Sequence, residues 1–326
     1  MVRTTRFKAE EIGDLTGKVA IVTGTSPGGI GAETARQLAI HGAKVYLAAR
    51  NEEKNLKTLN EIKQSAPEGK TLQLETLKLD LADLAAVRKS ADEFKTREQK
   101  LDILILNAGV MACPKAITKD GWEVQFQTNY LGHFLFAKEL LPLLEAASRG
   151  PEDPSRVITL TSIGHLFASA SPYKINFDSQ DAVNRTMGPS VAGNFFRYSQ
   201  AKLAALLHAR EWNSRIGRPG GSKVMASGVH PGAVSTNLYE YTPLGSLMKR
   251  VMITPADGAL SSLYVATSPD LIKEDSWDVY RGDFGLKHHD SGLSRSKHLQ
   301  TSLWELSEDA IKSFTSAPRT PAGASS

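Results

Sequence analysis

Residues 22–31 read Val-Thr-Gly-Thr-Ser-Pro-Gly-Gly-Ile-Gly, a glycine-rich stretch that begins inside an apolar run, Lys18–Thr23, and leads into a helical pattern, Ala32–Ile40. The apolar run predicts a buried strand. Glycine allows a backbone to approach a pyrophosphate closely, and a helix N-terminus offers unpaired N–H groups and a positive dipole. Such a cluster can also be a simple tight turn. Its position between the first strand and the first helix favours a dinucleotide-binding site.

Farther along the chain, short apolar runs alternate with helical patterns. Further strands are predicted at Val45–Ala49, Leu72–Leu79, Leu101–Leu106, Arg156–Leu160 and Lys223–Val229. Helices are predicted after a cap at Asn51, over Asp83–Gln99 and Gly121–Ala147, and from near Tyr198. This alternation predicts an α/β fold with a doubly wound parallel sheet of the Rossmann type in a single domain. We assign the domain to residues 15–310, with an N-terminal arm at 1–14 and a C-terminal tail at 311–326.

Two segments interrupt the alternation after the carboxyl ends of predicted strands. Residues 163–197 contain Pro172, Gly188, Pro189 and Gly193, and residues 237–253 mix aromatic, proline, glycine and basic residues, which predicts irregular chain in both. Open α/β sheets bind ligands at this edge, so we expect both segments on the substrate side. The second segment fits a lid over the site or a peripheral membrane contact through Leu244, Leu247, Met248, Lys249 and Arg250.

The composition is near the average of soluble globular proteins. Of 326 residues, 41% are apolar and 23% charged, which excludes disordered and fibrous classes. The net charge of +4 is spread along the chain, so no nucleic-acid partner is expected. The single cysteine, Cys113, cannot form an internal disulfide, which fits a reducing, cytoplasmic location. We expect neither a secretory signal nor a transmembrane helix, which needs roughly 18–20 apolar residues.

A metal site is the less favoured interpretation of His288-His289-Asp290. Adjacent histidines in a polar loop are ordinarily solvated, and the lone cysteine cannot build a thiolate site. No metal is therefore expected.

The end of the second predicted strand selects the cofactor. Ala48-Ala49-Arg50-Asn51 carries no acid that would accept hydrogen bonds from a ribose 2′-OH, whereas arginine suits a 2′-phosphate. Arg50, helped by Ser26 or Lys54, therefore favours NADP(H) over NAD(H). The alternative is that Arg50 is only a solvated loop residue.

The stretch Tyr198-Ser-Gln-Ala-Lys202 suggests proton-transfer chemistry. At positions i and i+4 of a helix, the phenol and the ammonium project from one face, with Cβ atoms roughly 6 Å apart. Free tyrosine has a pKa of about 10, and a fixed positive charge nearby stabilises the phenolate, so that Tyr198 can exchange protons at neutral pH. This spacing also arises by chance and needs support. Ser162, which follows the strand at Arg156–Leu160, supplies a hydroxyl that can hydrogen-bond a substrate oxygen as charge develops on it.

Together these motifs resemble the short-chain dehydrogenase/reductase family, and the resemblance extends over residues 15–307. The family fingerprint Thr-Gly-x-x-x-Gly-x-Gly is similar to residues 23–31, which have one extra residue. The resemblance makes Gly24, Gly29 and Gly31 the counterparts of the family's glycines, with Pro27-Gly28 widening the loop.

The resemblance implies a role for each candidate site residue. It implies that Ser162 polarises the substrate oxygen and that Tyr198 exchanges its proton. It implies that Lys202 tunes Tyr198 and binds the ribose, and that Asn129 holds a water that relays protons. Cofactor contacts are implied for Gly24, Ser26, Gly29, Ile30, Gly31, Arg50, Asp80, Leu81, Asn107, Ala108, Gly109, Tyr198, Lys202, Pro231, Gly232, Val234 and Thr236. Asp80 could instead simply cap the helix that follows it.

Several features resemble the retinol-dehydrogenase-like branch of the family: the long separation of Ser162 from Tyr198, Tyr46–Arg50, Asn129–Phe134 and Leu303–Ser307. Many fungal members of this branch reduce ketones or aldehydes in secondary metabolism. The resemblance implies an NADP(H)-dependent oxidoreductase that transfers a hydride between nicotinamide and a carbonyl or alcohol of a lipophilic small molecule. It also implies a possible homodimer through the helices bearing Tyr130 and Tyr198. The alternatives are a non-catalytic dinucleotide sensor or scaffold, or an enoyl reductase or epimerase, on the same fold.

Overall fold

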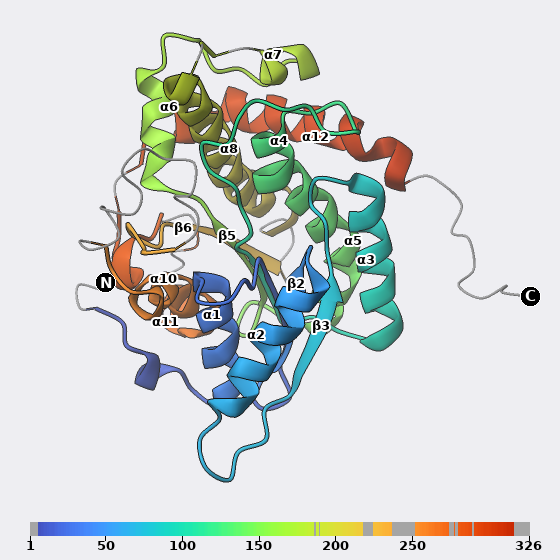
Figure 1. Ribbon diagram of the computed structural model, residues 1–326, viewed down its shortest axis with the longest axis vertical. Coiled ribbons are helices and arrows are strands. Elements are labelled where there is room, and N and C mark those ends of the chain that lie inside the picture. The colour runs from blue at the N-terminus through green and yellow to red at the C-terminus, as the bar shows by residue number, and fades with distance from the viewer. Residues whose placement is uncertain are drawn as a thin grey trace, which may run out of the picture.

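Six parallel strands form one sheet in the order β3-β2-β1-β4-β5-β6 (Figure 1). The computed structural model describes residues 6–185, 187–188, 190–217, 224–236, 252–273, 277, 280–288 and 290–315. Its strands are β1 (Val19–Thr23), β2 (Lys44–Ala49), β3 (Leu74–Lys78), β4 (Ile103–Leu106), β5 (Ser155–Leu160) and β6 (Val224–Val229). The strand order reverses between β1 and β4, which creates the crevice where doubly wound sheets bind ligands. The predicted fold class is confirmed.

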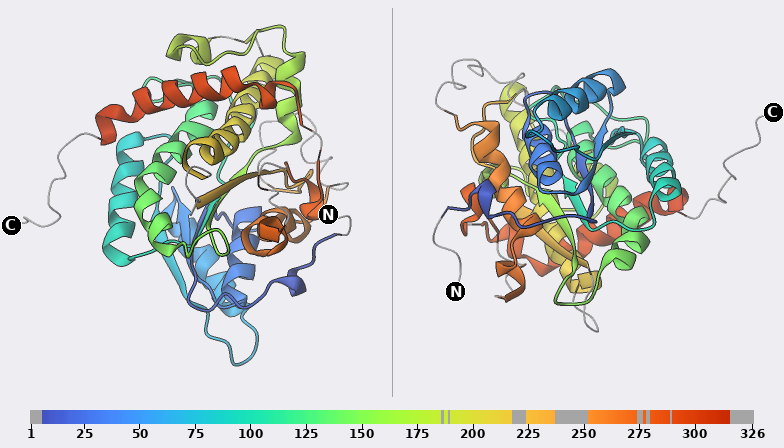
Figure 2. Two further views of the ribbon diagram at one scale, coloured as in Figure 1. Left: turned by 180° about the vertical axis from the view of Figure 1, so that it is seen from behind. Right: turned by 90° about the horizontal axis from the view of Figure 1, so that it is seen from below.

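Helices cover both faces of the sheet (Figure 2). Successive side chains of β1 point to opposite faces, so Ile21 joins one buried cluster and Val22 the other. The first cluster packs against α3 (Leu84–Arg97), α5 (Gly132–Ala147), α8 (Ser190–Trp212) and α12 (Lys297–Thr315). The second packs against α1 (Ile30–Ile40), α2 (Glu52–Gln64) and α10 (Pro255–Thr267).

Short elements connect these layers. They are η1 (Ala9–Glu11), α4 (Val124–Phe126), η2 (Gln127–Leu131), η3 (Ile163–Leu166), α6 (Phe167–Ala170), α7 (Gln180–Asn184), η4 (Asn213–Gly217), α11 (Asp270–Lys273), η6 (Asp283–Gly285) and η7 (Leu293–Arg295). The helix predicted over Gly121–Ala147 begins at Val124 and contains a π-helical turn, η2, before α5. Gly132 stands where α5 begins, because a Cβ there would lie 2.5 Å from the carbonyl oxygen of Leu81.

The segment 163–197 is more regular than its composition predicts. It contains η3, α6 and α7, and α8 begins at Ser190, eight residues before Tyr198. The prediction of a helix beginning near Tyr198 is therefore wrong. Gly193 reads as a helix breaker in the sequence, but a Cβ there would lie 2.2 Å from the carbonyl oxygen of Gly188. The glycine is needed because the preceding chain crosses close to the helix.

The first and the last described segments of the chain both contribute to the packed structure. Phe7 and Ile12, from the predicted N-terminal arm, are buried against the cluster that contains α1 and α10, and the N–H of Phe7 donates to the carbonyl oxygen of Phe284. At the other end, α12 continues past residue 310 to Thr315, and Ile311 is buried. Residues 311–315 therefore belong to a packed helix, whereas the sequence predicts a tail from residue 311.

Helix α12 covers the face through which the resemblance implies a homodimer (Figure 1). Trp304 and Leu303 of α12 are buried, and the hydroxyls of Tyr130 and Ser307 are 2.7 Å apart. Tyr130 is 1% exposed, and burial raises the pKa of its phenol. The chain's own helix α12 thus covers Tyr130, and a homodimer stays a prediction.

Candidate active site

The loop between β1 and α1 has room only for glycine at two positions. Gly24 has a φ of +74°, and a Cβ there would lie 2.6 Å from the Cα of Ala108. A Cβ on Gly31 would lie 2.5 Å from Nδ2 of Asn107 and 2.6 Å from the carbonyl oxygen of Gly24. Asn107 ties this loop to β1, because its Nδ2 donates to the carbonyl oxygen of Thr23 at 2.6 Å.

The N-terminus of α1 fits a pyrophosphate. Its cap residue, Gly29, has no side chain to satisfy the first N–H groups, and those of Ile30 and Gly31 fall in the turn that lacks intrahelical partners. Gly28 absorbs the extra residue of the loop, because it adopts a φ of +66°. Ser26 is exposed on the same loop. The predicted glycines therefore leave a backbone cradle at the positive end of the α1 dipole, and its free N–H groups suit a phosphate group.

Arg50 follows the last residue of β2 and is exposed. The N–H of Gly24 donates to the carbonyl oxygen of Ala48 at 2.8 Å, so the glycine loop begins beside the strand end that leads to Arg50. Asn55 reinforces this arrangement: its Oδ1 accepts from the Thr25 hydroxyl at 2.7 Å, and its Nδ2 donates to Leu47. Asn55 was not predicted, since nothing local in the sequence distinguishes it from other helix residues.

The residues that follow the carboxyl ends of β3 and β4 lie on the same side of the sheet as the glycine loop. Asp80 is half-buried and its Oδ1 accepts from the N–H of Ala82, while Leu81 is buried. The cap of α3 is Asp83, whose side chain accepts from Ala86, so capping does not explain Asp80. Ala108 and Gly109 continue from β4 beside the glycine loop, each half-buried.

Tyr198 and Lys202 lie on one face of α8, with the lysine ammonium 5.8 Å from the centre of the tyrosine ring. Both side chains are buried, at 3% and 5% exposure. The Nζ of Lys202 donates to the carbonyl oxygen of Leu160 at 2.9 Å, which fixes the ammonium at the carboxyl end of β5. The hydroxyl of Thr161 donates to the carbonyl oxygen of Lys202 at 2.7 Å. Burial lowers the pKa of Lys202 to about 8.

Ser162 stands beside Tyr198, separated only by Gly164. A Cβ on Gly164 would lie 3.2 Å from the Ser162 Oγ and 3.0 Å from Cε1 of Tyr198. The N–H of Gly164 donates to the Ser162 Oγ at 3.0 Å, so the serine also caps η3. The predicted serine and tyrosine are therefore brought together, and the absence of a side chain at Gly164 leaves space between them.

Asn129 lies in the π-helical turn η2, and its side chain makes two hydrogen bonds with the backbone of Val110. Its Oδ1 accepts from the N–H of Val110 at 2.8 Å, and its Nδ2 donates to the carbonyl oxygen of Val110 at 2.9 Å. The position of a Cβ on Gly109 would be 3.1 Å from Asn129 Oδ1 and 3.5 Å from Lys202 Nζ. Asn129 and Lys202 thus flank the same glycine.

The segment after β6 completes this edge. Pro231 and Gly232 are half-buried, and Gly232 adopts a φ of +89°. Val234 is buried and forms a β-bridge with Ile253. It packs so closely against Gly258 that a Cβ there would lie 2.5 Å from Cγ2 of Val234. Thr236 is half-buried at the end of this described stretch. Most of the predicted substrate-side segment 237–253, including Leu244, Leu247, Met248, Lys249 and Arg250, lies outside the described residues.

An apolar rim lies beside Tyr198. The ring of Phe195 is 5.9 Å from that of Tyr198 and 5.2 Å from that of Phe167. Phe167 is 47% exposed. Met111 and Ala112 pack with Tyr198 in the same small cluster. Ile163, which follows Ser162, and Val191, on α8, are two further exposed apolar residues. These residues were not predicted, because isolated apolar residues in an irregular segment carry no pattern.

The part of the chain that the structure describes contains neither a cluster of metal ligands nor a membrane-spanning helix. No group of three or more histidine, cysteine or acidic side chains there is arranged to hold a metal. No helix among those residues combines the length and the apolar character needed to cross a bilayer. His289 falls outside the described residues, while Asp290 pairs with Arg210 and Arg295.

Comparison with known proteins gives the chain its family. A family model described as short chain dehydrogenase matches residues 18–172. An uncharacterized oxidoreductase of Schizosaccharomyces pombe is 40% identical over 283 residues, which cover 84% of this chain and 79% of that protein. Retinol dehydrogenase 12 of Mus musculus is 37% identical over 297 residues, covering 90% of this chain and 86% of its own.

Solved structures have the same fold. A crystal structure of an uncharacterized protein from Mycobacterium Paratuberculosis matches with a TM-score of 0.71 at 33% identity, covering 94% of this chain and 98% of that one. The RhlG/NADP active-site complex of Pseudomonas aeruginosa matches with a TM-score of 0.56 at 23% identity, covering 79% and 92%. Because relatives of this identity cover most of its length, the chain belongs to the short-chain dehydrogenase/reductase family, in its retinol-dehydrogenase-like branch, and is an oxidoreductase.

Proposed function

We propose that the protein transfers a hydride between NADP(H) and a carbonyl or alcohol group of a lipophilic small molecule. The observation that carries this proposal is the meeting of Ser162 and Tyr198 around Gly164, with the buried ammonium of Lys202 beneath the tyrosine. A hydroxyl, a phenol and a fixed cation near one another are the groups that a carbonyl needs when it gains charge and a proton.

Each of these residues takes one role in the proposed reaction. The nicotinamide, when bound, supplies or accepts the hydride. Ser162 donates a hydrogen bond to the substrate oxygen, and Tyr198 gives that oxygen its proton in reduction or removes it in oxidation. Lys202 stabilises the phenolate form of Tyr198 through its charge. Asn129, fixed on Val110 beside Lys202, would order a water that passes protons to the lysine.

Three features support NADP(H) as the cofactor. The bare backbone cradle at Gly24 and Gly31 fits a pyrophosphate, and the exposed Arg50 stands where a ribose 2′-phosphate would lie. No acid follows β2 at that point. The structurally similar RhlG was solved with NADP, which agrees with this proposal.

Replacing Arg50 with leucine is expected to raise the KM for NADPH about 10- to 100-fold, because a charge-assisted hydrogen bond contributes about 1.5–3 kcal/mol. The KM for NADH, which has no 2′-phosphate, should change less than about twofold by the same reasoning. Initial rates with each cofactor would measure both effects. Arg149→Leu, just beyond the C-terminal end of α5, is the matched control and should leave both values unchanged. An equal loss with NADH would contradict the proposed contact.

The apolar rim supports a lipophilic substrate. Phe167, Ile163 and Val191 remain 41–47% exposed beside the catalytic face of α8, and each gains from burial against an apolar ligand. The relatives named retinol dehydrogenase act on a lipophilic alcohol by their names. We extend the proposal to a ketone or aldehyde of secondary metabolism in the cytoplasm; a reducing compartment agrees with the single free cysteine, Cys113.

A homologous series of straight-chain aldehydes tests this substrate class. We expect kcat/KM to rise about fourfold for each added CH₂ group over several carbons, since each buried CH₂ contributes about 0.8 kcal/mol. Phe167→Ser should flatten this dependence, while Leu56→Ser, an equally exposed apolar residue on α2, should not. A profile that is flat in the wild type would refute the lipophilic class.

The alternative functions make different predictions. A dinucleotide sensor would bind NADPH without consuming it in the presence of any carbonyl compound, and it would need no phenol beside a serine hydroxyl. An enoyl reductase would saturate a carbon–carbon double bond and leave the carbonyl intact, and an epimerase would return the cofactor unchanged. Peripheral membrane contact through Leu244, Leu247, Met248, Lys249 and Arg250 stays a prediction, because these residues lie outside the described part of the chain. We do not propose a homodimer through η2 and α8, because α12 covers Tyr130 there.

A further inference from the structure

Two buried histidines hold one peptide group next to the proposed catalytic serine. Nδ1 of His165 lies 2.6 Å from the carbonyl oxygen of Ser162, and Nδ1 of His230 lies 3.3 Å from the N–H of Ile163, which donates to it. These two backbone groups belong to the same peptide plane. His165 is 0% and His230 6% exposed, so neither contact competes with bulk water. The plane that leads out of Ser162 is therefore fixed at both of its polar ends.

The hydrogen bonds require a different tautomer of each imidazole. A carbonyl oxygen only accepts, so His165 must carry its proton on Nδ1, and its Nε2 accepts from the N–H of Ser291 at 3.4 Å. His230 accepts at Nδ1 and must carry its proton on Nε2. A second proton on either ring would place a donor against an N–H group and break that contact.

The surroundings keep both rings neutral. Burial, with smaller contributions from the neighbouring His288, His165 and Lys202, lowers the pKa of His230 to about 3. Burial also lowers the pKa of His165; Arg210 and His288 act in the same direction, while Asp290 and the bond to Ser162 oppose them.

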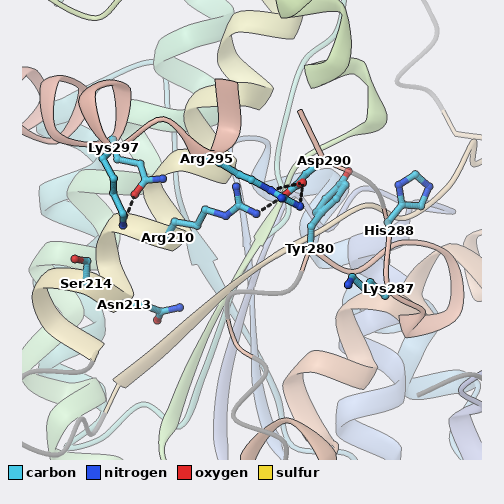
Figure 3. Close-up of a pocket in the computed structure, with 10 residues that line it drawn as sticks. Arg210, Asn213, Ser214, Tyr280, Lys287, His288, Asp290, Arg295 and Lys297 are labelled. Atoms are coloured by element: carbon cyan, nitrogen blue, oxygen red, sulfur yellow. Dashed lines mark hydrogen bonds and ion pairs between the residues drawn. The ribbon is translucent and has the colours of Figure 1, made fainter. Parts of the chain in front are cut away.

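Neighbouring rings and an ion-pair cluster hold the histidines in place. The ring of Tyr280 packs edge-on against His165 at 5.2 Å and against His288 at 5.6 Å, and His288 packs against His230 at 5.5 Å. Figure 3 shows Arg210 converging on Asp290, the residue before Ser291, and Arg295 pairs with the same carboxylate. This clamp fixes the N–H group of Ser291 that His165 accepts from.

We propose that His165 and His230 are positioning residues that aim the Ser162 hydroxyl at the substrate oxygen by restraining the peptide plane between Ser162 and Ile163. The proposal rests on the role proposed above for Ser162. It assigns a function to two buried histidines that take no part in the chemistry proposed for Tyr198 and Lys202. Neither histidine transfers a proton in the reaction.

Kinetics of leucine and asparagine variants test the proposal. His165→Leu and His230→Leu are each expected to lower kcat about 10- to 100-fold, because a misplacement of about 1 Å can cost a hundredfold. The KM for NADPH should stay within twofold on the same argument. An asparagine offers a donor or an acceptor where Nδ1 stood, so His165→Asn and His230→Asn should recover most of the loss. His298→Leu, an exposed histidine of α12, is the control and should retain wild-type kcat.

A double-mutant cycle separates positioning from general stability. If the histidines act through Ser162, adding His165→Leu to Ser162→Ala should lower kcat by less than twofold beyond Ser162→Ala alone. Fully additive losses, or asparagine variants as impaired as the leucine variants, would overturn the proposal.

Histidine ¹⁵N spectra of the apoprotein provide a test that needs no turnover. We expect His165 as the Nδ1–H tautomer and His230 as the Nε2–H tautomer, both unchanged between pH 5.5 and 8. The two leucine variants assign the signals. A His165 signal protonated on Nε2, or titration of either ring in this range, would overturn the proposal. If no carbonyl is reduced by the wild type, the proposed function fails, and these spectra still decide whether the peptide plane is held as described.

Discussion

Tyr198→Phe is expected to lower kcat for carbonyl reduction by about 10³-fold, within the range that a positioned general acid contributes. The substitution removes only the phenolic oxygen. The ring would keep its packing against Phe195 and its place above the Lys202 ammonium. We therefore expect a normal melting temperature and a dissociation constant for NADPH within about threefold of the wild type, since the loss lies in the transition state.

Steady-state rates with one aldehyde and fluorescence titration of NADPH measure these two quantities separately. Phe195→Tyr, which adds a phenol on the same helix at a different position, is a useful control, because its hydroxyl should not restore activity in the Tyr198→Phe background. A Tyr198→Phe enzyme with more than a tenth of the wild-type kcat would exclude Tyr198 as the proton donor.

Lys202→Met is expected to abolish turnover to a similar degree, by about 10³-fold, yet to stabilise the apoprotein. The lysine is 5% exposed, and its ammonium donates a hydrogen bond to the carbonyl oxygen of Leu160. Burial lowers its pKa from 10.5 to about 8, a difference that corresponds to about 3 kcal/mol of unfavourable charge burial. Removing the charge recovers this energy, and loss of the hydrogen bond subtracts about 1 kcal/mol. The free energy of unfolding at pH 7 should therefore rise by about 2 kcal/mol.

The pH dependence of that gain has a defined sign. Below pH 8 the lysine is protonated in both the folded and the unfolded state, so the full cost of burying the charge is present. As the pH rises from 8 to 10.5 the folded state releases its proton first, and the cost disappears. Urea unfolding of wild type and Lys202→Met should thus differ most at about pH 7 and least near pH 10. Lys202→Met less stable than the wild type at pH 7 would show that the ammonium is stabilised by its surroundings.

Features that depend only on residues close together in the sequence were predicted well. The glycine loop, the cap at Asn51 and the Tyr198–Lys202 spacing each depend on neighbours within a few positions, and the structure contains all of them. The alternation of strands and helices then brings the strand ends to one edge, as topology requires.

What escaped prediction depends on contacts between distant segments. Gly193 resembles a helix breaker until the chain at Gly188 is seen to cross it. Asn55 supports the cofactor loop from α2, and His230 reaches Ile163 from 67 positions away. The contact between Tyr130 and Ser307 of α12 likewise joins residues 177 positions apart, and no hydrophobic periodicity in either segment predicts it.

The most direct test of the proposed function is the fate of a deuterium atom from the cofactor. NADPH deuterated at C4, prepared as each of its two stereoisomers, would be incubated with a lipophilic aldehyde or ketone that the protein consumes, and the product analysed by mass spectrometry and NMR. We predict that one isomer, and only one, delivers its deuterium to the carbinol carbon, because the proposed reaction would have the nicotinamide bound with a single face toward Ser162 and Tyr198. Deuterium on any other carbon, or NADPH left unconsumed across the whole series of carbonyl compounds, would contradict the proposed function.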